Sequence, residues 1–476
     1  MQLGRPDIPR PTLSAREKAR RLLEQALGPS KVVTGEDACA AFAHDESEAE
    51  GVTPDAVVLA ESADDILAAL RVAREAEVPI TPRAGGTGRT GGAVPVAGGI
   101  VLATSGMKSI KEIDRRDGVA VVEPGVVLAD LHAAVEAEGW FYPPDPNSLA
   151  DCCLGGNVAE NAGGPRALKY GVTRDWVLGM DAFLIGGQRI RAGRRTTKGV
   201  TGYDVAGLLV GSEGTLAVFG DITLGLMPKP EQVMTLMVLF ESVRAASVAV
   251  ETAISGGLLP RCIEFLDGMT LEAMRRAGNA IDARAGAMLL VEFDGDEHVC
   301  ERDAERFGGA AESAGALEVL VAQDAAQRAR LWSARREMSR AVRKLTKFKL
   351  SEDVVVPRRS IGALLDHVAL LGEREKVRHL TYGHGGDGNL HVNFLWDDAE
   401  EVPAVSRAIE ALFREVVRLG GTLSGEHGIG VLKAPYLPLE QAPELIELER
   451  DLKRVFDPQN LLNPGKIFPA GAHRAC

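Results

Sequence analysis

A glycine-rich loop at residues 84–93 restricts the fold of this chain more than any other stretch. It contains the pattern Gly-x-Gly-x-x-Gly at Gly86, Gly88 and Gly91. In a nicotinamide-type dinucleotide fold, a helix follows this pattern at once and places its N-terminus on the pyrophosphate. Here a proline and two further glycines follow, and then a strand-like run at 100–104. We therefore exclude that fold and expect the backbone N–H groups of the loop to hold a diphosphate directly.

Three more loops of the same kind follow within the next 130 residues or so. They lie at 155–164, 196–204 and 210–215, and they combine glycine with small and amide side chains. Small residues at this density let the backbone approach a large flat ligand closely. Any one loop alone fits a loop-rich α+β domain with tight turns equally well. The four together predict a large cofactor.

The stretch 381–394, Thr-Tyr-Gly-His-Gly-Gly-Asp-Gly-Asn-Leu-His-Val-Asn-Phe, predicts a glycine turn followed by a strand. Three glycines disfavour a helix, since each costs roughly 1 kcal/mol relative to alanine in a helix interior. In the strand, His391 and Asn393 alternate with apolar residues, so they share one face. The turn can bring His384 back beside His391. Two imidazoles there indicate a metal or proton-transfer site; the alternative is a turn with one exposed and one buried histidine.

The bulk composition excludes several classes of protein. A chain of 476 residues predicts two or three domains, and 45% hydrophobic with 25% charged residues is typical of a globular protein. The net charge of −13 argues against non-specific nucleic-acid binding. Six cysteines without a C-x-x-C pair favour a reducing compartment. No apolar N-terminal segment and no run of about 18 apolar residues is visible, so we expect a cytoplasmic protein without a membrane span.

Periodicity and capping signals divide the chain. We expect a helix at 13–27 with Ser14 as its candidate N-cap, a strand at 57–60 and a helix from Ser62 to about residue 77. A further helix is expected at 331–340, and it carries Arg335. Pro228-Lys-Pro230 reads as a boundary, after which the glycine density falls. The expected organisation is an N-terminal helical segment at 1–40, a cofactor domain at 41–228, a cap domain at 229–425 and a C-terminal segment at 426–476.

The motifs taken in order resemble a known family. Pro82–Ala93, Asn161-Ala-Gly-Gly, Gly202-Tyr-Asp and Gly211-Ser-Glu-Gly-Thr look like an FAD-binding domain of the vanillyl-alcohol-oxidase type. With Gly383-His-Gly-Gly-Asp-Gly-Asn-Leu-His, Gly425-Glu-His-Gly-Ile-Gly and Asn463-Pro-Gly-Lys, the set resembles the FAD-dependent D-2-hydroxyacid dehydrogenases, which include D-lactate dehydrogenases, glycolate oxidase catalytic subunits and D-2-hydroxyglutarate dehydrogenases. The resemblance covers roughly residues 40–470. It implies an α+β fold: a two-subdomain FAD-binding domain plus a cap domain with an antiparallel sheet, and a C-terminal tail that returns to the flavin.

The resemblance also assigns residues to FAD. The implied contacts are Gly85, Gly86, Thr87, Gly88, Arg89, Thr90, Pro144, Asn161, Gly163, Gly164, Tyr170, Glu213 and Asn463. Many proteins of this fold attach FAD covalently through a histidine of the glycine loop. No histidine lies in residues 83–93, so we expect non-covalent FAD.

By motif match, the resemblance implies a divalent metal held by His384, His391 and Glu426. Two imidazoles and one carboxylate leave open positions, as in catalytic zinc sites, with Mn²⁺ and Co²⁺ as further candidates. His427 matches the family's base, Asn393 a substrate-contacting amide and Arg335 the group that binds the substrate carboxylate. The implied chemistry is proton removal by His427 and hydride transfer from C2 to flavin N5, giving a 2-oxo acid.

The substrate remains open among members of the family. Hydroxyglutarate-specific members carry Lys-x-Asp-x-Ser before the proline that follows the arginine helix, whereas here Lys349 comes two residues too early and Ser351 stands in the lysine's place. The sequence therefore favours a D-lactate-like or glycolate-like substrate over D-2-hydroxyglutarate. The implied electron acceptor is an electron-transfer flavoprotein, cytochrome c or a quinone. A homodimer is the candidate assembly, and no nucleic acid is expected as a partner.

Three other readings stay open. A sugar or aromatic-alcohol oxidase on the same fold would use O₂ and no metal. A flavin-free metallohydrolase would use His384, His391 and Glu426 to activate water. A non-catalytic binding module would reduce no flavin with any 2-hydroxy acid.

Overall fold

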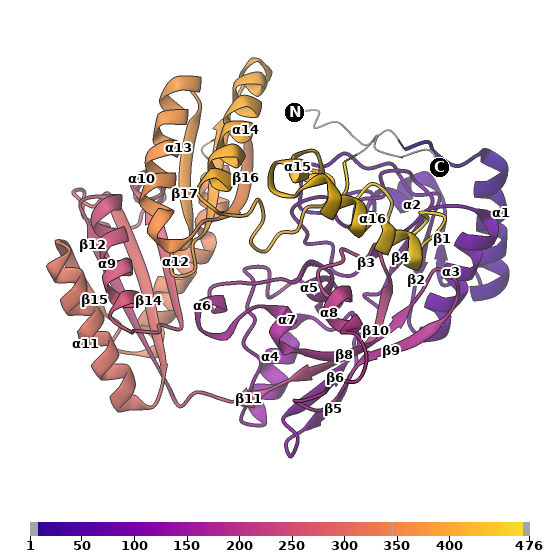
Figure 1. Ribbon diagram of the computed structural model, residues 1–476, viewed down its shortest axis with the longest axis horizontal. Coiled ribbons are helices and arrows are strands. Elements are labelled where there is room, and N and C mark those ends of the chain that lie inside the picture. The colour runs from indigo at the N-terminus through magenta and orange to yellow at the C-terminus, as the bar shows by residue number, and fades with distance from the viewer. Residues whose placement is uncertain (1–7, 345, 470–476) are drawn as a thin grey trace. The chain divides into compact units, whose positions relative to one another are not determined.

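The computed structural model describes residues 8–344 and 346–469, apart from the side chains at 334, 336, 337 and 339–341. Contacts divide the chain into two compact units (Figure 1). One, which we call the seven-stranded unit, comprises residues 163–171 and 230–425. The other, which we call the glycine-rich unit, comprises residues 8–162, 172–229 and 426–469. The segment 163–171 thus belongs by its contacts to the seven-stranded unit, although both of its neighbouring segments belong to the other.

A single antiparallel sheet forms the centre of the seven-stranded unit. Its strands are β12 (Gln232–Phe240), β13 (Cys262–Asp267), β14 (Ala287–Gly295), β15 (Ala316–Val321), β16 (Phe348–Val355), β17 (Arg378–His384) and β18 (Asn389–Trp396). They lie in the order β15-β12-β14-β13-β17-β18-β16. The hairpin β17–β18 contains the predicted glycine turn. At Gly388 (φ +89°) a Cβ atom would collide with the carbonyl of Val356, so the turn requires glycine there.

Helices cover both faces of this sheet. On one face, a continuous layer packs against the strands, as Figure 1 shows; its helices are α9 (Val243–Ser255), α11 (Glu297–Ser313), α13 (Ile361–Glu375) and α14 (Val402–Arg418). On the other face lie α10 (Gly268–Arg276) and α12 (Ala325–Arg343), joined to the sheet by an apolar cluster that includes Leu266, Met338 and Tyr382. The short helices η1 (Arg358–Ser360), η2 (Ala399–Glu401) and α6 (Ala167–Tyr170) complete the unit. Helix α12 therefore places Arg335 over the second face.

The glycine-rich unit has two larger sheets. The four-stranded sheet contains β1 (Val32–Val33), β2 (Ala56–Leu59), β3 (Ile80–Arg83) and β4 (Ile100–Ala103), in the order β1-β2-β4-β3, with β2, β3 and β4 parallel. The five-stranded antiparallel sheet contains β5 (Ile110–Asp114), β6 (Val119–Val122), β8 (Val177–Phe183), β9 (Arg189–Gly193) and β10 (Val218–Gly225), in the order β5-β6-β10-β8-β9. A two-stranded ribbon pairs β7 (Trp140–Phe141) with β11 (Met227–Pro228).

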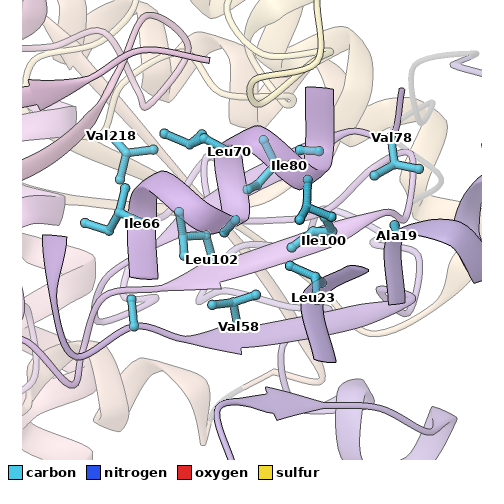
Figure 2. Packing of buried hydrophobic residues seen from close by; sticks show 14 of the residues in the cluster. Ala19, Leu23, Val58, Ile66, Leu70, Val78, Ile80, Ile100, Leu102 and Val218 are labelled. Atoms are coloured by element: carbon cyan, nitrogen blue, oxygen red, sulfur yellow. The ribbon is translucent and has the colours of Figure 1, made fainter. Parts of the chain in front are cut away.

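Helices complete the glycine-rich unit. They are α1 (Leu13–Leu27), α2 (Glu36–Ala40), α3 (Ala63–Ala76), α4 (Leu128–Ala137), α5 (Leu154–Glu160), α7 (Thr173–Trp176), α8 (Val205–Leu209), η3 (Ala434–Tyr436), α15 (Leu437–Glu440) and α16 (Pro443–Phe456). Figure 2 shows side chains of α1, α3 and the four-stranded sheet converging in one core, with Leu23, Ile66 and Leu102 among the labelled residues. These three side chains are fully buried, which anchors β3 and the glycine loop that follows it.

The structure confirms most expected elements and corrects one cap. The helix at 13–27 forms as predicted, but its N-cap is Thr12, whose Oγ1 accepts the N–H of Ala15 at 3.3 Å. The prediction of Ser14 was wrong because Ser14 already lies inside the first turn. Ser62 caps α3 as expected. The chain between β3 and β4 contains no helix, in agreement with the excluded dinucleotide fold. Among the described residues, no helix is both long and apolar enough to cross a bilayer.

Candidate functional site

A buried polar row runs across four neighbouring strands of the seven-stranded sheet, β13, β17, β18 and β16. Strand register pairs Glu264 with His384, Tyr382 with His391 and His391 with Asp353. Paired residues and residues two apart on one strand point to the same side of a sheet. Each of these five side chains is at most 7% exposed. The face of the sheet that carries His391 and Asn393 is therefore buried, and helix α12 covers it.

His384 and His391 lie side by side in this row. Their ring centroids are 5.5 Å apart with the rings nearly perpendicular, and a ring nitrogen of one lies within 4.8 Å of a ring nitrogen of the other. Both side chains are buried, at 2% and 3% exposure. This excludes the alternative of one buried and one exposed histidine. Two imidazole nitrogens at this separation can bind one metal ion.

Glu264 touches both a histidine and an arginine. Its Oε1 accepts the Nδ1–H of His384 at 2.5 Å, and its Oε2 lies 2.5 Å from Nη2 of Arg335. Burial would raise the pKa of Glu264, but the charges of Arg335 and His384 outweigh it and hold the pKa below its ordinary value. Sequence reasoning missed this residue. The sequence does contain one indication of its importance, because Glu264 is the single acid in the otherwise apolar run Cys-Ile-Glu-Phe-Leu at 262–266.

Arg335 and Asn393 each carry a buried polar atom without a hydrogen-bond partner among the described residues. For Arg335 this holds for Nε and also for Nη2, which lies in the ion pair with Glu264, and for Asn393 it holds for Oδ1. The guanidinium of Arg335 also lies over the ring of Tyr382 at 5.1 Å, and the amide nitrogen of Asn393 donates to the carbonyl of His391 at 2.8 Å. Buried groups of this kind are rare in native proteins. A bound ligand with one acceptor and one donor would satisfy both.

Asp353 anchors the segment that leads to the predicted metal-binding glutamate. Its carboxylate accepts the side-chain N–H of Asn389 at 2.6 Å, the hydroxyl of Ser424 at 3.0 Å and the backbone N–H of Gly425 at 2.9 Å. Asp353 lies 3.8 Å from Nδ1 of His391. Glu426 and His427 follow Gly425 directly in the chain and begin the last segment of the glycine-rich unit. Asp353 was also missed from sequence.

Within the glycine-rich unit, several predicted FAD residues meet the segment that starts at Glu426. Thr90 donates its hydroxyl to the carbonyl of His427 at 2.9 Å. Glu213 accepts the backbone N–H groups of residues 429 and 430, both at 2.7 Å. Asn463 donates to the carbonyls of Gly92 at 2.9 Å and Glu213 at 2.7 Å. The glycine loop, the motif at 211–215 and the C-terminal tail therefore lie together in this unit.

The N–H groups of the glycine loop are free to bind an anion. Among the described residues, no backbone N–H from Gly85 through Gly92 donates to a protein acceptor, a run that includes Thr87, Gly88 and Arg89. Gly86 (φ +70°) cannot accept a Cβ atom without displacing the guanidinium of Arg83. A run of unpaired N–H groups in one loop forms an anion-binding nest. The donor set suits a diphosphate.

The remaining predicted FAD residues contact other parts of the protein or lie in the seven-stranded unit. The carbonyl of Pro144 pairs with Nε2 of His132 at 3.0 Å, and Asn161 ends α5 in a left-handed conformation and accepts the N–H of Arg174 at 2.8 Å. Gly163, Gly164 and Tyr170 lie in the seven-stranded unit. There the hydroxyl of Tyr170 donates to Asp294 at 2.9 Å.

Three buried acids surround a lysine in the glycine-rich unit. Burial raises the pKa of Glu160 well above its ordinary value, and the nearby carboxylates of Glu213 and Asp45 add to the shift. Burial, offset by the three acids, lowers the pKa of Lys466 to about 8. The ammonium of Lys466 donates to the carbonyl of Val94 at 2.7 Å. Sequence periodicity gave no sign of this cluster.

Comparison with known proteins places the chain in a family. The FAD binding domain model matches residues 54–193, and the model for the C-terminal domain of FAD linked oxidases matches residues 229–467. The chain is similar to a glycolate oxidase subunit GlcD of Bacillus subtilis (strain 168), at 39% identity over 95% of this chain and 97% of the relative. It belongs to the FAD-linked oxidases, and is therefore an FAD-dependent oxidoreductase.

Further relatives and a solved structure agree. A D-lactate dehydrogenase of Anaerostipes hadrus is 34% identical over 93% of this chain and 95% of its own. A D-2-hydroxyglutarate dehydrogenase of Stutzerimonas stutzeri (strain A1501) is 31% identical over 94% and 98%. The 4-ethylphenol oxidase from Gulosibacter chungangensis superposes with a TM-score of 0.81 at 18% identity, over 98% of this chain and 99% of that one. This likeness confirms the predicted α+β fold of the vanillyl-alcohol-oxidase type.

Proposed function

We propose that this enzyme oxidises a small D-2-hydroxy acid, D-lactate-like or glycolate-like, to the 2-oxo acid with FAD and a divalent metal. The observation that carries the proposal is the buried row of His384, His391 and Glu264 beneath Arg335, with an unpaired Nε–H on the arginine. A metal-binding histidine pair beside a buried cation suits a hydroxy acid, which offers a hydroxyl and a carboxylate. Similarity to a glycolate oxidase subunit and a D-lactate dehydrogenase supports the same class.

FAD would bind non-covalently in the glycine-rich unit. The run of N–H groups at Gly85–Gly92 without protein acceptors fits its diphosphate. Glu213 and Asn463 would act by fixing the backbone around that loop, as their hydrogen bonds indicate. Bound FAD supplies the acceptor for the two electrons of the oxidation, which then pass to a carrier.

The metal would be held by His384, His391 and Glu426. The donor chemistry fits, because in the tautomer whose Nδ1–H donates to Glu264 the lone pair of His384 is on Nε2, the nitrogen that would bind a metal. Glu426 follows Gly425, whose N–H is fixed by Asp353 beside His391. A divalent ion such as Zn²⁺ would supply Lewis acidity that lowers the pKa of the substrate hydroxyl.

The chain's own residues would bind the substrate and move one proton. Arg335 would receive the substrate carboxylate through its free N–H edge, and Asn393 would accept a donor through its unpaired Oδ1. His427 would accept the hydroxyl proton, since an ordinary imidazole with a pKa near 6.5 is partly unprotonated at neutral pH. The oxidation removes two electrons, the hydroxyl proton and the C2 hydrogen, and leaves the 2-oxo acid.

An anaerobic screen of D- and L-2-hydroxy acids tests this function. The purified yellow protein is mixed with D-lactate, glycolate, D-2-hydroxyglutarate and the L-enantiomers, and bleaching of the flavin is followed. We expect bleaching with a D-acid or glycolate and none with the L-forms. A colourless protein, or no bleaching with any of them, contradicts the proposal.

A second candidate is a substrate with a second carboxylate, such as D-2-hydroxyglutarate. It is favoured by Lys349, whose ammonium lies 3.1 Å from the hydroxyl of Tyr382 and over its ring at 5.6 Å. Tyr382 is the ring that Arg335 covers. The early position of Lys349 in the sequence thus does not remove it from the buried row, since residues two apart on a strand share a face. Lys349→Met should raise KM for D-2-hydroxyglutarate selectively if this candidate holds.

A further inference from the structure

We propose that Glu264 is a positioning residue that sets the metal-binding histidine and the substrate-binding arginine at once. The inference rests on the proposed function and adds a residue to it. Glu264 touches neither flavin nor substrate in this proposal. It acts through His384 and Arg335, each 2.5 Å from one of its two oxygens.

The location of Glu264 argues against a role in stability alone. It is fully buried at the centre of β13, between Ile263 and Phe265, which are also buried. A charged group in such a place is costly unless it is paired, and an apolar pair of equal volume is often at least as stable. An acid at this position therefore points to something that an apolar side chain cannot do.

The first task is the tautomer of His384. Arginine stays protonated in proteins, so a carboxylate held against Arg335 is an acceptor only. The short contact to Nδ1 of His384 then requires a proton on that nitrogen, which leaves the lone pair of Nε2 for a metal. Carboxylates that hold a metal-binding histidine in this way typically change metal affinity 10–100-fold when removed. Register supports the contact, because Glu264 and His384 are paired residues of adjacent strands.

The second task is the orientation of Arg335. The guanidinium is held from two sides, by Glu264 through Nη2 and by the ring of Tyr382 at 5.1 Å. These contacts use Nη2 and one face of the planar group. Its Nε–H has no partner among the described residues and is the donor that remains for a substrate carboxylate. One carboxylate therefore links the metal site to the anion site.

Asp353, the second carboxylate of the buried row, has different hydrogen-bond partners from Glu264. Asp353 lies 3.8 Å from Nδ1 of His391, longer than a hydrogen bond, and its carboxylate accepts from Asn389, Ser424 and Gly425. Asp353 thus fixes a loop, whereas Glu264 fixes two functional side chains. The proposal concerns Glu264 because its two short contacts both reach residues of the candidate site.

Glu292 offers a matched control on the same face. It pairs with Cys262, two residues before Glu264, and is 4% exposed. Its Oε1 accepts from Thr235 at 2.7 Å and from the indole of Trp332, which also lies in α12, at 2.6 Å. It contacts no candidate metal ligand. Glu292→Gln therefore reproduces the loss of a buried carboxylate beneath α12 without touching His384 or Arg335.

The test compares Glu264→Gln, Glu264→Asp and Glu292→Gln as flavin-loaded proteins. Zn²⁺ affinity is measured by competition with a chelator, and KM for the 2-hydroxy acid that bleaches the wild type is measured alongside. We expect Glu264→Gln to weaken Zn²⁺ binding about 10–100-fold and to raise KM, because both neighbours lose their anchor. Glu264→Asp should fall between it and the wild type, since the shorter side chain keeps the charge but cannot reach both partners. It also serves if the glutamine variant does not fold.

Three outcomes separate the claims. Unchanged Zn²⁺ affinity in Glu264→Gln, or an equal loss in Glu292→Gln, overturns the role of Glu264 while the proposed function stands. If the flavin of the wild type bleaches with a hydroxy acid although the protein retains no divalent ion, the metal is not required and the proposed role of Glu264 is overturned. Weakening confined to the Glu264 variants supports the proposal.

Discussion

Two carboxyl groups, one in each unit, have pKa values that are shifted in opposite directions. Glu264 of the seven-stranded unit has Arg335 and His384 at 2.5 Å, and its pKa is lowered. Glu160 of the glycine-rich unit faces other acids, and burial raises its pKa well above the ordinary value. Burial alone favours the neutral acid in both places, so the sign of the neighbours makes the difference. In one unit the neighbours favour the ionised acid beside the candidate metal and carboxylate site, and in the other they favour the neutral acid near a loop suited to a diphosphate.

This comparison leaves neither acid as the base for the reaction. The Glu264 carboxylate is already paired with His384 and Arg335, and burial with nearby acids raises the pKa of Glu160 well above its ordinary value. The proton acceptor should then be His427, and His427→Ala should lower the rate of flavin reduction about 10²–10⁴-fold while FAD and metal stay bound. Anaerobic stopped-flow measures this rate. His298→Ala, on the exposed surface of α11, is the control. A normal rate of flavin reduction in His427→Ala would indicate that a carboxylate is the base, contrary to the comparison of Glu264 with Glu160.

Removing the cation beside Glu264 should have the next largest effect. Arg335→Met leaves a buried carboxylate with less compensation, which costs about 3–5 kcal/mol of stability. It should also lower kcat/KM by the equivalent of about 1.5–3 kcal/mol, the usual contribution of a hydrogen bond to a charged group. Because the folded pKa of Glu264 lies below its unfolded value, the pair stabilises the fold above that unfolded pKa, and the contribution is lost as pH falls through the folded pKa.

The pH dependence makes the Arg335 prediction specific. The stability deficit of Arg335→Met should be full at pH 7 and shrink towards pH 4, where Glu264 can be neutral. Urea unfolding at several pH values measures it. Arg261→Met is the control, since Arg261 is a buried arginine on the same sheet paired with Glu292 and Asp294; it should lose stability but keep kcat/KM. A deficit in Arg335→Met that does not change with pH argues against an ionised Glu264.

Sequence reasoning identified the candidate site residues of the hairpin β17–β18 but not the groups that contact them. The alternation at 381–394 placed His391 and Asn393 on one face, and the glycine turn brought back His384, because both follow from local periodicity. Glu264 and Asp353 were missed because their contacts depend on strand order. Glu264 lies 120 positions from His384, and no local pattern predicts that β13 pairs with β17. The motif at 161–170 was likewise assigned by family resemblance to FAD, and the structure places Tyr170 against Asp294.

Replacing Glu160 in the glycine-rich unit should increase the stability of the protein. Glu160→Gln removes a group whose folded pKa is raised, so ionising it opposes folding at any pH above its unfolded value. The variant should be more stable than the wild type at pH 8, by about 1–3 kcal/mol, the usual penalty of a buried unsatisfied polar group. The gain should vanish below about pH 4, where the carboxyl is neutral in both states. Thermal unfolding across this range measures it, and a loss of stability at pH 8 would show that Glu160 is ionised.

The smallest expected effect concerns the second acid of the seven-stranded unit. Ser424→Ala removes one of the donors to Asp353 and leaves those from Asn389 and Gly425. It should cost about 1 kcal/mol in stability and weaken metal binding only a few-fold. Chelator competition and urea unfolding measure the two effects. A loss of metal affinity as large as that of Glu264→Gln would make Asp353, not Glu264, the main anchor of the site.

The dependence of flavin reduction on metal tests the central claim most directly. The purified protein is treated with a chelator, FAD content is verified, and the hydroxy acid that bleaches the untreated protein is added without oxygen. We expect chelation to abolish bleaching of the flavin and added Zn²⁺, Mn²⁺ or Co²⁺ to restore it, because His384 and His391 lie together in the buried row. Bleaching at the untreated rate in the metal-free protein would contradict it and indicate a metal-free flavin oxidase.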